Sequence, residues 1–138
     1  MGDLSAHFST KEFACPDCGR TKVSGILILA LEELRTALGD APIFVDSGYR
    51  CPEHNANVGG QSASQHLLGN AADIRVANKS LQEMFDGARS VKDFLNGGVG
   101  VYDADPPFIH VDVRGSTARW ARVKGEYVGI AESGLVKL

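Results

Sequence analysis

The sequence lacks the features of two large functional classes, membrane-spanning proteins and nucleic-acid-binding proteins. Its longest apolar run, residues 26–31, is far shorter than the roughly 18 residues of a membrane span. Lys and Arg number 14 against 17 Asp and Glu, which gives a formal net charge of -3. We therefore expect no membrane span and no broad basic surface of the kind that nucleic-acid binding needs.

The N-terminus lacks the signals that direct a chain out of the cytoplasm or onto a lipid. Residues 1–13 (MGDLSAHFSTKEF) contain neither the basic nor the apolar segment of a secretory signal. Gly2 begins no myristoylation pattern, because Ala6 stands where Ser or Thr is needed. We therefore expect a protein that is cytoplasmic as synthesised.

Cysteine is scarce, with Cys15, Cys18 and Cys51 as its three positions. An odd number argues against a full disulfide framework. Cys15 and Cys18 form a CPDC segment, but no second CxxC follows as in a zinc ribbon, and no clear strand precedes it as in a thioredoxin-like motif. Three interpretations stay open: a structural turn, which comes first, a local metal site completed by Cys51 and His54, and a redox pair.

The 138 residues, 43% of them hydrophobic, suit a single domain over residues 1–138, with residues 1–20 as an irregular N-terminal arm. Hydrophobic spacing at three and four predicts helices, and runs rich in β-branched and aromatic residues predict strands. The expected helices cover residues 10–13, 24–39, 51–58 and 80–95, and the expected strands cover 43–45, 71–76, 99–103, 108–114 and 126–130, the third and fourth forming a hairpin.

Three polar side chains stand out against this pattern. Asp73 lies inside one predicted strand, and His110 lies between Ile109 and Val111 in another, where apolar side chains are preferred. His66 precedes Asp73 by seven residues in a segment rich in small and turn-forming residues. Two imidazoles and one carboxylate hold a zinc ion with one position open for water, as in a catalytic zinc site. We therefore expect one catalytic Zn²⁺ at these three residues.

Three motifs carry a family resemblance: SGYR at residues 47–50, S-x-H-x-x-G-x-A-x-D at 64–73, and FIHVDVR at 108–114. From about residue 7 to residue 120 the chain resembles zinc D-Ala-D-Ala carboxypeptidases and peptidoglycan endopeptidases, above all the short single-domain members of bacteria and phages. Their fold group includes the hedgehog signalling domain. The resemblance implies a small α+β domain with a central antiparallel sheet and helices packed on one face.

The resemblance also implies a general base, and here the sequence departs from the family. Many relatives carry an acid three residues before the last zinc histidine, where this chain has Pro107. Asp112, on the same strand face as His110, is the first candidate for the base or for a partner of the ligand. Asp105 and Asp103, in the adjacent turn, are the alternatives.

Four residues are candidates for substrate binding. Arg50 resembles the family arginine that meets substrate, with pairing to an internal acid as the alternative. Ser64 is expected to bond substrate or orient the site, or else to cap its loop. Tyr49 and Trp120 are included as substrate contacts, although packing is the more common role of such side chains.

These observations favour a zinc metallopeptidase that hydrolyses a bond in peptidoglycan stem peptides, of carboxypeptidase or endopeptidase type. The alternatives are a non-catalytic zinc-containing binding module of the same fold, which Pro107 favours, and a phage tail or lysis component. The expected partner is the stem peptide, with no nucleic acid and no membrane, and the expected state is a monomer. Reaching the cell wall would then require a phage-type release.

Overall fold

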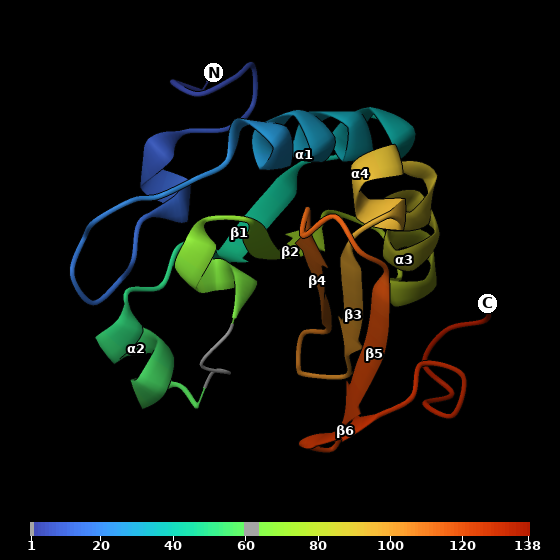
Figure 1. Ribbon diagram of the computed structural model, residues 1–138. Helices are drawn as coiled ribbons and strands as arrows, with labels where there is room; N and C mark the ends of the chain where they lie inside the picture. Colours follow the sequence, from blue (N-terminus) through green and yellow to red (C-terminus); the bar gives the residue numbers. More distant parts are fainter. Residues whose placement is uncertain (1, 60–63) are drawn as a thin grey trace.

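A six-stranded sheet forms the centre of the protein in the computed structural model, which describes residues 2–59 and 64–138 (Figure 1). Part of the loop expected around residues 59–64 lies outside the described residues. The strands follow the order β1-β2-β4-β3-β5-β6. They are β1 Ile43–Ser47, β2 Ala71–Val76, β3 Gly98–Tyr102, β4 Phe108–Asp112, β5 Ala118–Val123 and β6 Glu126–Val128.

The sheet is mixed, because β3 and β5 pair in parallel while the other neighbours pair antiparallel. The expected central antiparallel sheet thus contains one parallel pair, β3 with β5. Hairpin signals join strands that are adjacent in sequence, whereas β5 returns to the far edge of β3. The α+β class and the hairpin of β3 with β4 are confirmed.

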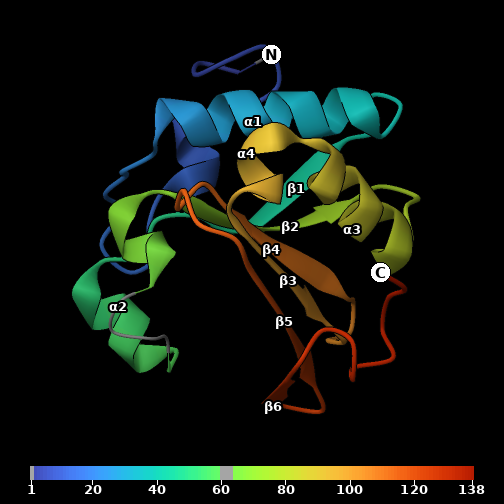
Figure 2. The ribbon, with the colours of Figure 1, turned by 45° about the vertical axis from the view of Figure 1, so that its right-hand side comes forward.

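Helices α1 Gly25–Ala37, α3 Leu81–Ser90 and α4 Lys92–Leu95 gather on one side of this sheet, and the short α2 Pro52–Asn57 lies apart from them (Figures 1 and 2). In the described part of the chain no helix has the length and apolar character to cross a membrane. The helices are η1 Thr10–Phe13, α1 Gly25–Ala37, α2 Pro52–Asn57, η2 Gln65–Leu68, α3 Leu81–Ser90 and α4 Lys92–Leu95.

Capping side chains start the two longest helices. The Ser24 side chain accepts the Ile26 N–H at the start of α1, and Ser80 with Glu83 forms a capping box at the start of α3. The single helix expected over residues 80–95 was wrong, because the chain leaves the helical conformation at Val91. The Ser90 hydroxyl donates to the Gly87 carbonyl at 2.6 Å, the carbonyl that the Val91 N–H would bond in a continuing helix, and the Val91 N–H donates to the Ala88 carbonyl instead.

The two faces of the sheet carry different side chains. The helix side holds fully buried aliphatic residues of the central strands, which form one core with the helices. The opposite side carries a polar row, since Asp73 of β2 pairs with His110 of β4, His110 with Gly100 of β3, and Gly100 with Trp120 of β5. Strand alternation therefore places a functional row on one face and the stabilising core on the other. The core aliphatics of these strands are Ala72, Ile74, Val99, Val101, Ile109, Val111 and Ala121.

The N-terminal arm is attached to the domain through two aromatic anchors. Phe8 and Phe13 are buried, and their rings lie 6.1 Å apart. The Phe13 carbonyl also accepts the Tyr49 N–H at 2.9 Å. The arm is therefore fixed directly beside the SGYR segment.

Candidate metal centre

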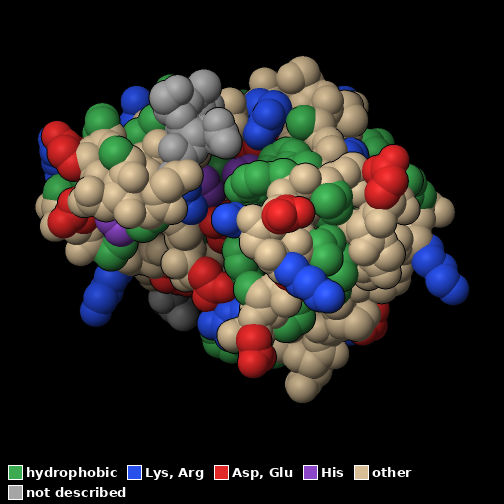
Figure 3. All heavy atoms as spheres, turned by 90° about the horizontal axis from the view of Figure 1, so that it is seen from below, with side chains coloured by type: hydrophobic (Ala, Val, Ile, Leu, Met, Phe, Trp, Pro, Cys, Tyr) green, Lys and Arg blue, Asp and Glu red, His purple; other side chains and the backbone are tan. Residues whose placement is uncertain are grey.

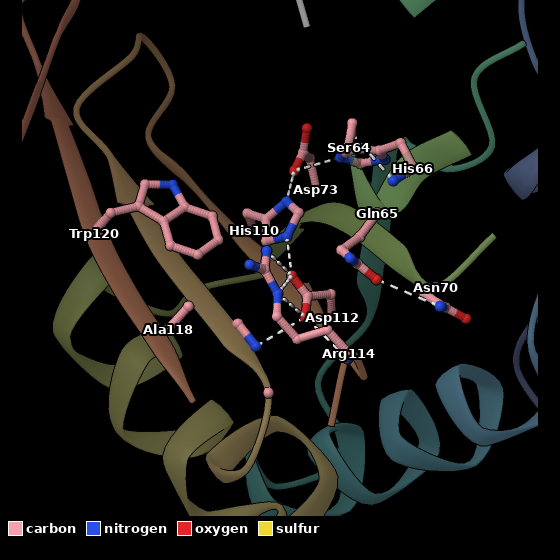
Figure 4. Close-up of polar contacts among 12 residues, drawn as sticks. Ser64, Gln65, His66, Asn70, Asp73, His110, Asp112, Arg114, Ala118 and Trp120 are labelled. Atoms are coloured by element: carbon pink, nitrogen blue, oxygen red, sulfur yellow. Dashed lines mark hydrogen bonds and ion pairs between the residues drawn. The ribbon is translucent and has the colours of Figure 1, made fainter. Parts of the chain in front are cut away.

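His66, Asp73 and His110 converge at the centre of the polar row. Asp73 Oδ1 lies 3.3 Å from His66 Nε2 and 3.1 Å from His110 Nδ1. All three residues are buried, and one ligand atom from each lies within 4.8 Å of the others. Figure 4 shows the Asp73 carboxylate between the two imidazoles. The structure thus assembles the three ligand candidates that the sequence suggested.

Local structure explains how His66 reaches this position. Ser64 caps η2 by accepting the His66 N–H at 3.2 Å, and Gly69 ends it at a φ of 72°. A Cβ at Gly69 would come within 2.3 Å of the Lys22 carbonyl oxygen, so a larger residue there would displace the turn. The short helix therefore directs the imidazole back onto the sheet.

The partners of the outer ring nitrogens determine the tautomers of both histidines. His66 Nδ1 lies 2.7 Å from the Gly48 carbonyl, which only accepts, so Nδ1 carries the proton. His110 Nε2 lies 2.6 Å from Asp112 Oδ2, so the proton sits on Nε2. The other two ring nitrogens, His66 Nε2 and His110 Nδ1, then direct their lone pairs toward Asp73 Oδ1, which is also an acceptor. Three acceptors facing one point fit a cation, as in metal sites whose histidines are oriented by a second acceptor.

Electrostatics in the cluster favour the same conclusion. Burial alone raises the pKa of Asp73, but without a metal ion hydrogen bonds from His110 and His66 in their protonated, charged forms outweigh it and hold that pKa well below its usual range. Burial alone lowers the pKa of His110, but its bonds to Asp112 and Asp73 raise it. The carboxylate therefore stays ionised, and the site attracts positive charge, which a proton or a metal ion supplies.

Asp112 lies behind His110 and is fully buried. Its oxygens accept from His110, from the Gly98 N–H at 2.8 Å and from Arg114 Nη2 at 2.7 Å. Burial alone raises the pKa of Asp112, but the hydrogen bonds from His110 and Arg114 lower it by more than burial raises it, so the carboxylate is ionised. Of the two roles expected for Asp112, its position supports that of a partner orienting His110 and disfavours that of a base. Figure 4 shows it on the side of the ring away from Asp73.

Arg50 pairs with an internal acid and also lies at the surface of the cleft. It lines the cleft, and its Nη2 lies 3.3 Å from Asp73 Oδ2, the oxygen turned away from the histidines. Its Nε donates to Ser47 Oγ at 3.2 Å and its Nη1 to Asn55 Oδ1 at 3.4 Å. These contacts hold the guanidinium beside the metal ligands.

A cleft of about 720 Å³ opens above these residues. Figure 3 shows histidine side chains in a hollow with hydrophobic atoms along one side. Trp120 lies over Gly100, where a Cβ would come within 2.4 Å of its Nε1. The indole donates to Tyr102 Oη at 2.9 Å, and its ring centroid lies 4.9 Å from that of His110. Gly100 therefore leaves the space that lets an aromatic wall reach the metal centre.

The remaining candidates differ in position. Ser64 lines the cleft and also caps η2. Tyr49 does not line it, so the structure does not support the expected substrate contact; its backbone bond to the N-terminal arm explains its place. Asp105 is exposed in the β3–β4 turn and is likewise absent from the lining, whereas Asp103 is part of it. Asp103 also accepts the Lys124 N–H at 3.1 Å.

Sequence reasoning missed much of the aromatic wall. Tyr102 stacks on Phe108 with ring centroids 4.4 Å apart, and Tyr127 meets Tyr102 edge-on at 6.5 Å. Phe108 shares its strand face with His110, and this alternation was a usable signal. Tyr127 had no such signal, because its place depends on how β6 pairs with β5.

Comparison with known proteins agrees with this geometry. Residues 6–112 match the peptidase M15 family. A zinc D-Ala-D-Ala carboxypeptidase from Streptomyces albus G is 40% identical over 60 residues, which are 44% of this chain. The matched segment covers 24% of that relative's length. The match of most of the chain shows that this protein belongs to the peptidase M15 family.

Proposed function

We propose that this protein is a zinc-dependent peptidase that hydrolyses a peptide bond in peptidoglycan stem peptides. The observation that carries the proposal is the convergence of two imidazole lone pairs and a carboxylate oxygen at the floor of the cleft. Two nitrogens and one oxygen without a thiolate match catalytic zinc sites. Membership of the peptidase M15 family and the relative that is a zinc D-Ala-D-Ala carboxypeptidase support both the metal and the substrate class.

Each ligand is held by a partner that prepares it for the metal. His66, Asp73 and His110 would bind zinc, and the Gly48 carbonyl and Asp112 keep the two imidazoles in the metal-binding tautomers. Zinc at this position supplies a Lewis acid that activates water and polarises the scissile carbonyl. The chain holds the metal ligands in the orientation that this chemistry needs.

The cleft suits a peptide that ends in a carboxylate. Within the described residues Arg50 uses three N–H groups on internal acceptors, and a guanidinium carries five. Its remaining donors suit a peptide carboxylate beside the metal centre. The stacked Tyr102 and Phe108 rings supply an apolar wall for the peptide backbone and its methyl groups. If Arg50 holds the terminal carboxylate of the peptide, the distance from Arg50 to the metal centre determines which stem-peptide bond is cut.

Asp103 is the acid that we assign to proton transfer between the water and the leaving amine. Among the described residues, Asp103 and the ligand Asp73 are the acidic side chains that line the cleft. Asp112 is occupied behind His110, and Asp105 lies outside the lining. Asp103→Asn should abolish peptide cleavage while zinc stays bound, and Asp105→Asn should leave both unchanged. Full activity of Asp103→Asn would remove it from this role.

A second candidate function is a zinc-containing binding module without catalysis. Pro107 occupies the position of the usual acid, and Asp112 is taken up by His110 and Arg114. These two observations favour binding over cleavage. A role in a phage tail or in lysis, with release to the wall by that route, stays a prediction for either function.

Muropeptide analysis distinguishes the two candidates. Purified protein, loaded with zinc or treated with a chelator, is incubated with peptidoglycan, and the products are separated and identified by mass spectrometry. We expect a new product that disappears with the chelator and in His66→Ala. The control is His7→Ala, which removes an exposed histidine paired with Glu32 outside the cleft. Zinc-loaded protein that binds peptidoglycan without releasing a product would support the binding module instead.

A further inference from the structure

A second cluster of metal-binding side chains lies outside the cleft and outside the proposed function. Cys15, Cys18 and Cys51 are free thiols, and their sulfurs all lie within 4.8 Å of one another. The Cys15 and Cys51 sulfurs are 3.6 Å apart. Cys15 and Cys51 are buried, whereas Cys18 is exposed. The fold thus brings Cys51, 33 positions after Cys18 in the sequence, to the same point as the two thiols of the CPDC segment.

The backbone holds these sulfurs in place. The Cys15 N–H donates to the Arg20 carbonyl at 2.7 Å, and the Gly19 N–H donates to the Cys15 carbonyl at 2.8 Å, so the CPDC segment closes into a tight turn. The Cys51 N–H donates to Cys15 Sγ at 3.5 Å. Donors aimed at sulfur stabilise thiolates, the form that binds metal.

The distances agree better with metal coordination than with a disulfide. Zinc–sulfur bonds of about 2.3 Å at tetrahedral angles place two sulfurs about 3.8 Å apart. A disulfide needs about 2.05 Å between its sulfurs. The 3.6 Å between Cys15 and Cys51 is therefore close to the spacing of two zinc ligands.

We propose that Cys15, Cys18 and Cys51 bind a second, structural thiophilic metal ion, with zinc as the preferred metal. Binding releases the thiol protons to solvent, and the fourth coordination position lies on the exposed side beside Cys18. The ion would join the N-terminal turn to residue 51, which precedes α2 and follows Arg50. This second site would therefore stabilise the part of the cleft wall that carries Arg50.

The number of zinc ions bound per chain tests the proposal. The full chain is purified in the presence of a phosphine reductant, loaded with zinc, and freed of unbound zinc before the measurement. We expect two zinc ions per chain in the natural protein and one in Cys18→Ser, a change at an exposed position that leaves the core intact. His66→Ala should also keep one, and the double variant none. Asp17→Ala, an exposed change in the same turn, is the control and should keep two.

Cobalt identifies which site is filled. With Co²⁺ in place of zinc, the thiolate-to-metal charge-transfer band should be present in His66→Ala and absent in Cys18→Ser, because only the cysteine site contains sulfur. One zinc per chain that is lost in His66→Ala and kept in Cys18→Ser overturns the second site and leaves the proposed function standing. One zinc with the opposite behaviour contradicts the metal centre of the cleft instead. In protein purified without the reductant, a mass two hydrogens lower, with no metal retained at the cysteines, would show a disulfide and also overturn the proposal.

Discussion

Replacement of Asp112 by Asn tests how the chain prepares His110 for metal binding. The carboxylate accepts from five donors on His110, Gly98 and Arg114, the last contributing its backbone N–H, Nε and Nη2. An amide keeps only one acceptor oxygen. Placing that oxygen toward the Gly98 N–H and Arg114 Nε satisfies the larger number of donors, which turns the amide NH₂ toward His110 Nε2.

The expected consequence is a change of tautomer. An NH₂ group facing Nε2 favours the proton on Nδ1, the nitrogen that points to Asp73. Loss of a partner that orients a metal-binding histidine costs about 10- to 100-fold in metal affinity, or about 1.4–2.8 kcal/mol. We therefore expect zinc binding in Asp112→Asn to weaken by that factor, while the variant stays folded.

Competition with a chromophoric chelator measures the affinity, and urea unfolding of the metal-free protein measures stability separately. The matched control is Asp105→Asn, an exposed change on the neighbouring turn, which should bind zinc as the natural protein does. An unchanged zinc affinity in Asp112→Asn would refute the role assigned to this carboxylate. Equal weakening in both variants would trace the effect to charge alone.

Three further predictions concern the wall, the substrate and the fold. Gly100→Ala should displace Trp120 and shift the fluorescence emission of this single tryptophan. It should also reduce cleavage by up to about 100-fold through misplacement of substrate, with zinc retained. Gly25→Ala, at a helix start with open space around it, is the control, and unchanged fluorescence in Gly100→Ala would contradict the clash. Arg50→Gln should raise KM for a stem peptide by about 10- to 100-fold, since hydrogen bonds to charged groups contribute about 1.5–3 kcal/mol; an unchanged KM would exclude the contact. Ser80→Ala should lower the free energy of unfolding by about 1 kcal/mol in urea through loss of the cap on α3, and no loss would show that the cap contributes nothing.

Local patterns in the sequence predicted the elements that local interactions form. Strand alternation placed Asp73 and His110 on one face and their aliphatic neighbours on the other, and the structure follows this pattern. Ser24 and Ser80 predicted helix starts because capping involves residues only two or three positions away. The break at Val91 was missed, since the hydrophobic period continues across it.

Features that depend on contacts between residues far apart in the sequence could not be predicted. The parallel pairing of β3 with β5 brings Trp120 next to Gly100, and no local signal encodes that partner. The role of Asp112 was ambiguous for the same reason. Its strand position alone was compatible with facing the water or supporting the ligand, and contacts with Gly98 and Arg114 distinguish the two. The residue pattern and the family resemblance supplied the candidate ligand set but not these supporting contacts.

Diffraction from crystals grown with zinc, measured on both sides of the zinc absorption edge, shows whether a metal ion binds at His66, Asp73 and His110. We expect an anomalous peak about 2.0–2.2 Å from His66 Nε2, His110 Nδ1 and an oxygen of Asp73. Zinc-loaded crystals without a peak at these atoms, or with zinc bound through His66 Nδ1 and His110 Nε2, would show that these residues do not form the metal centre.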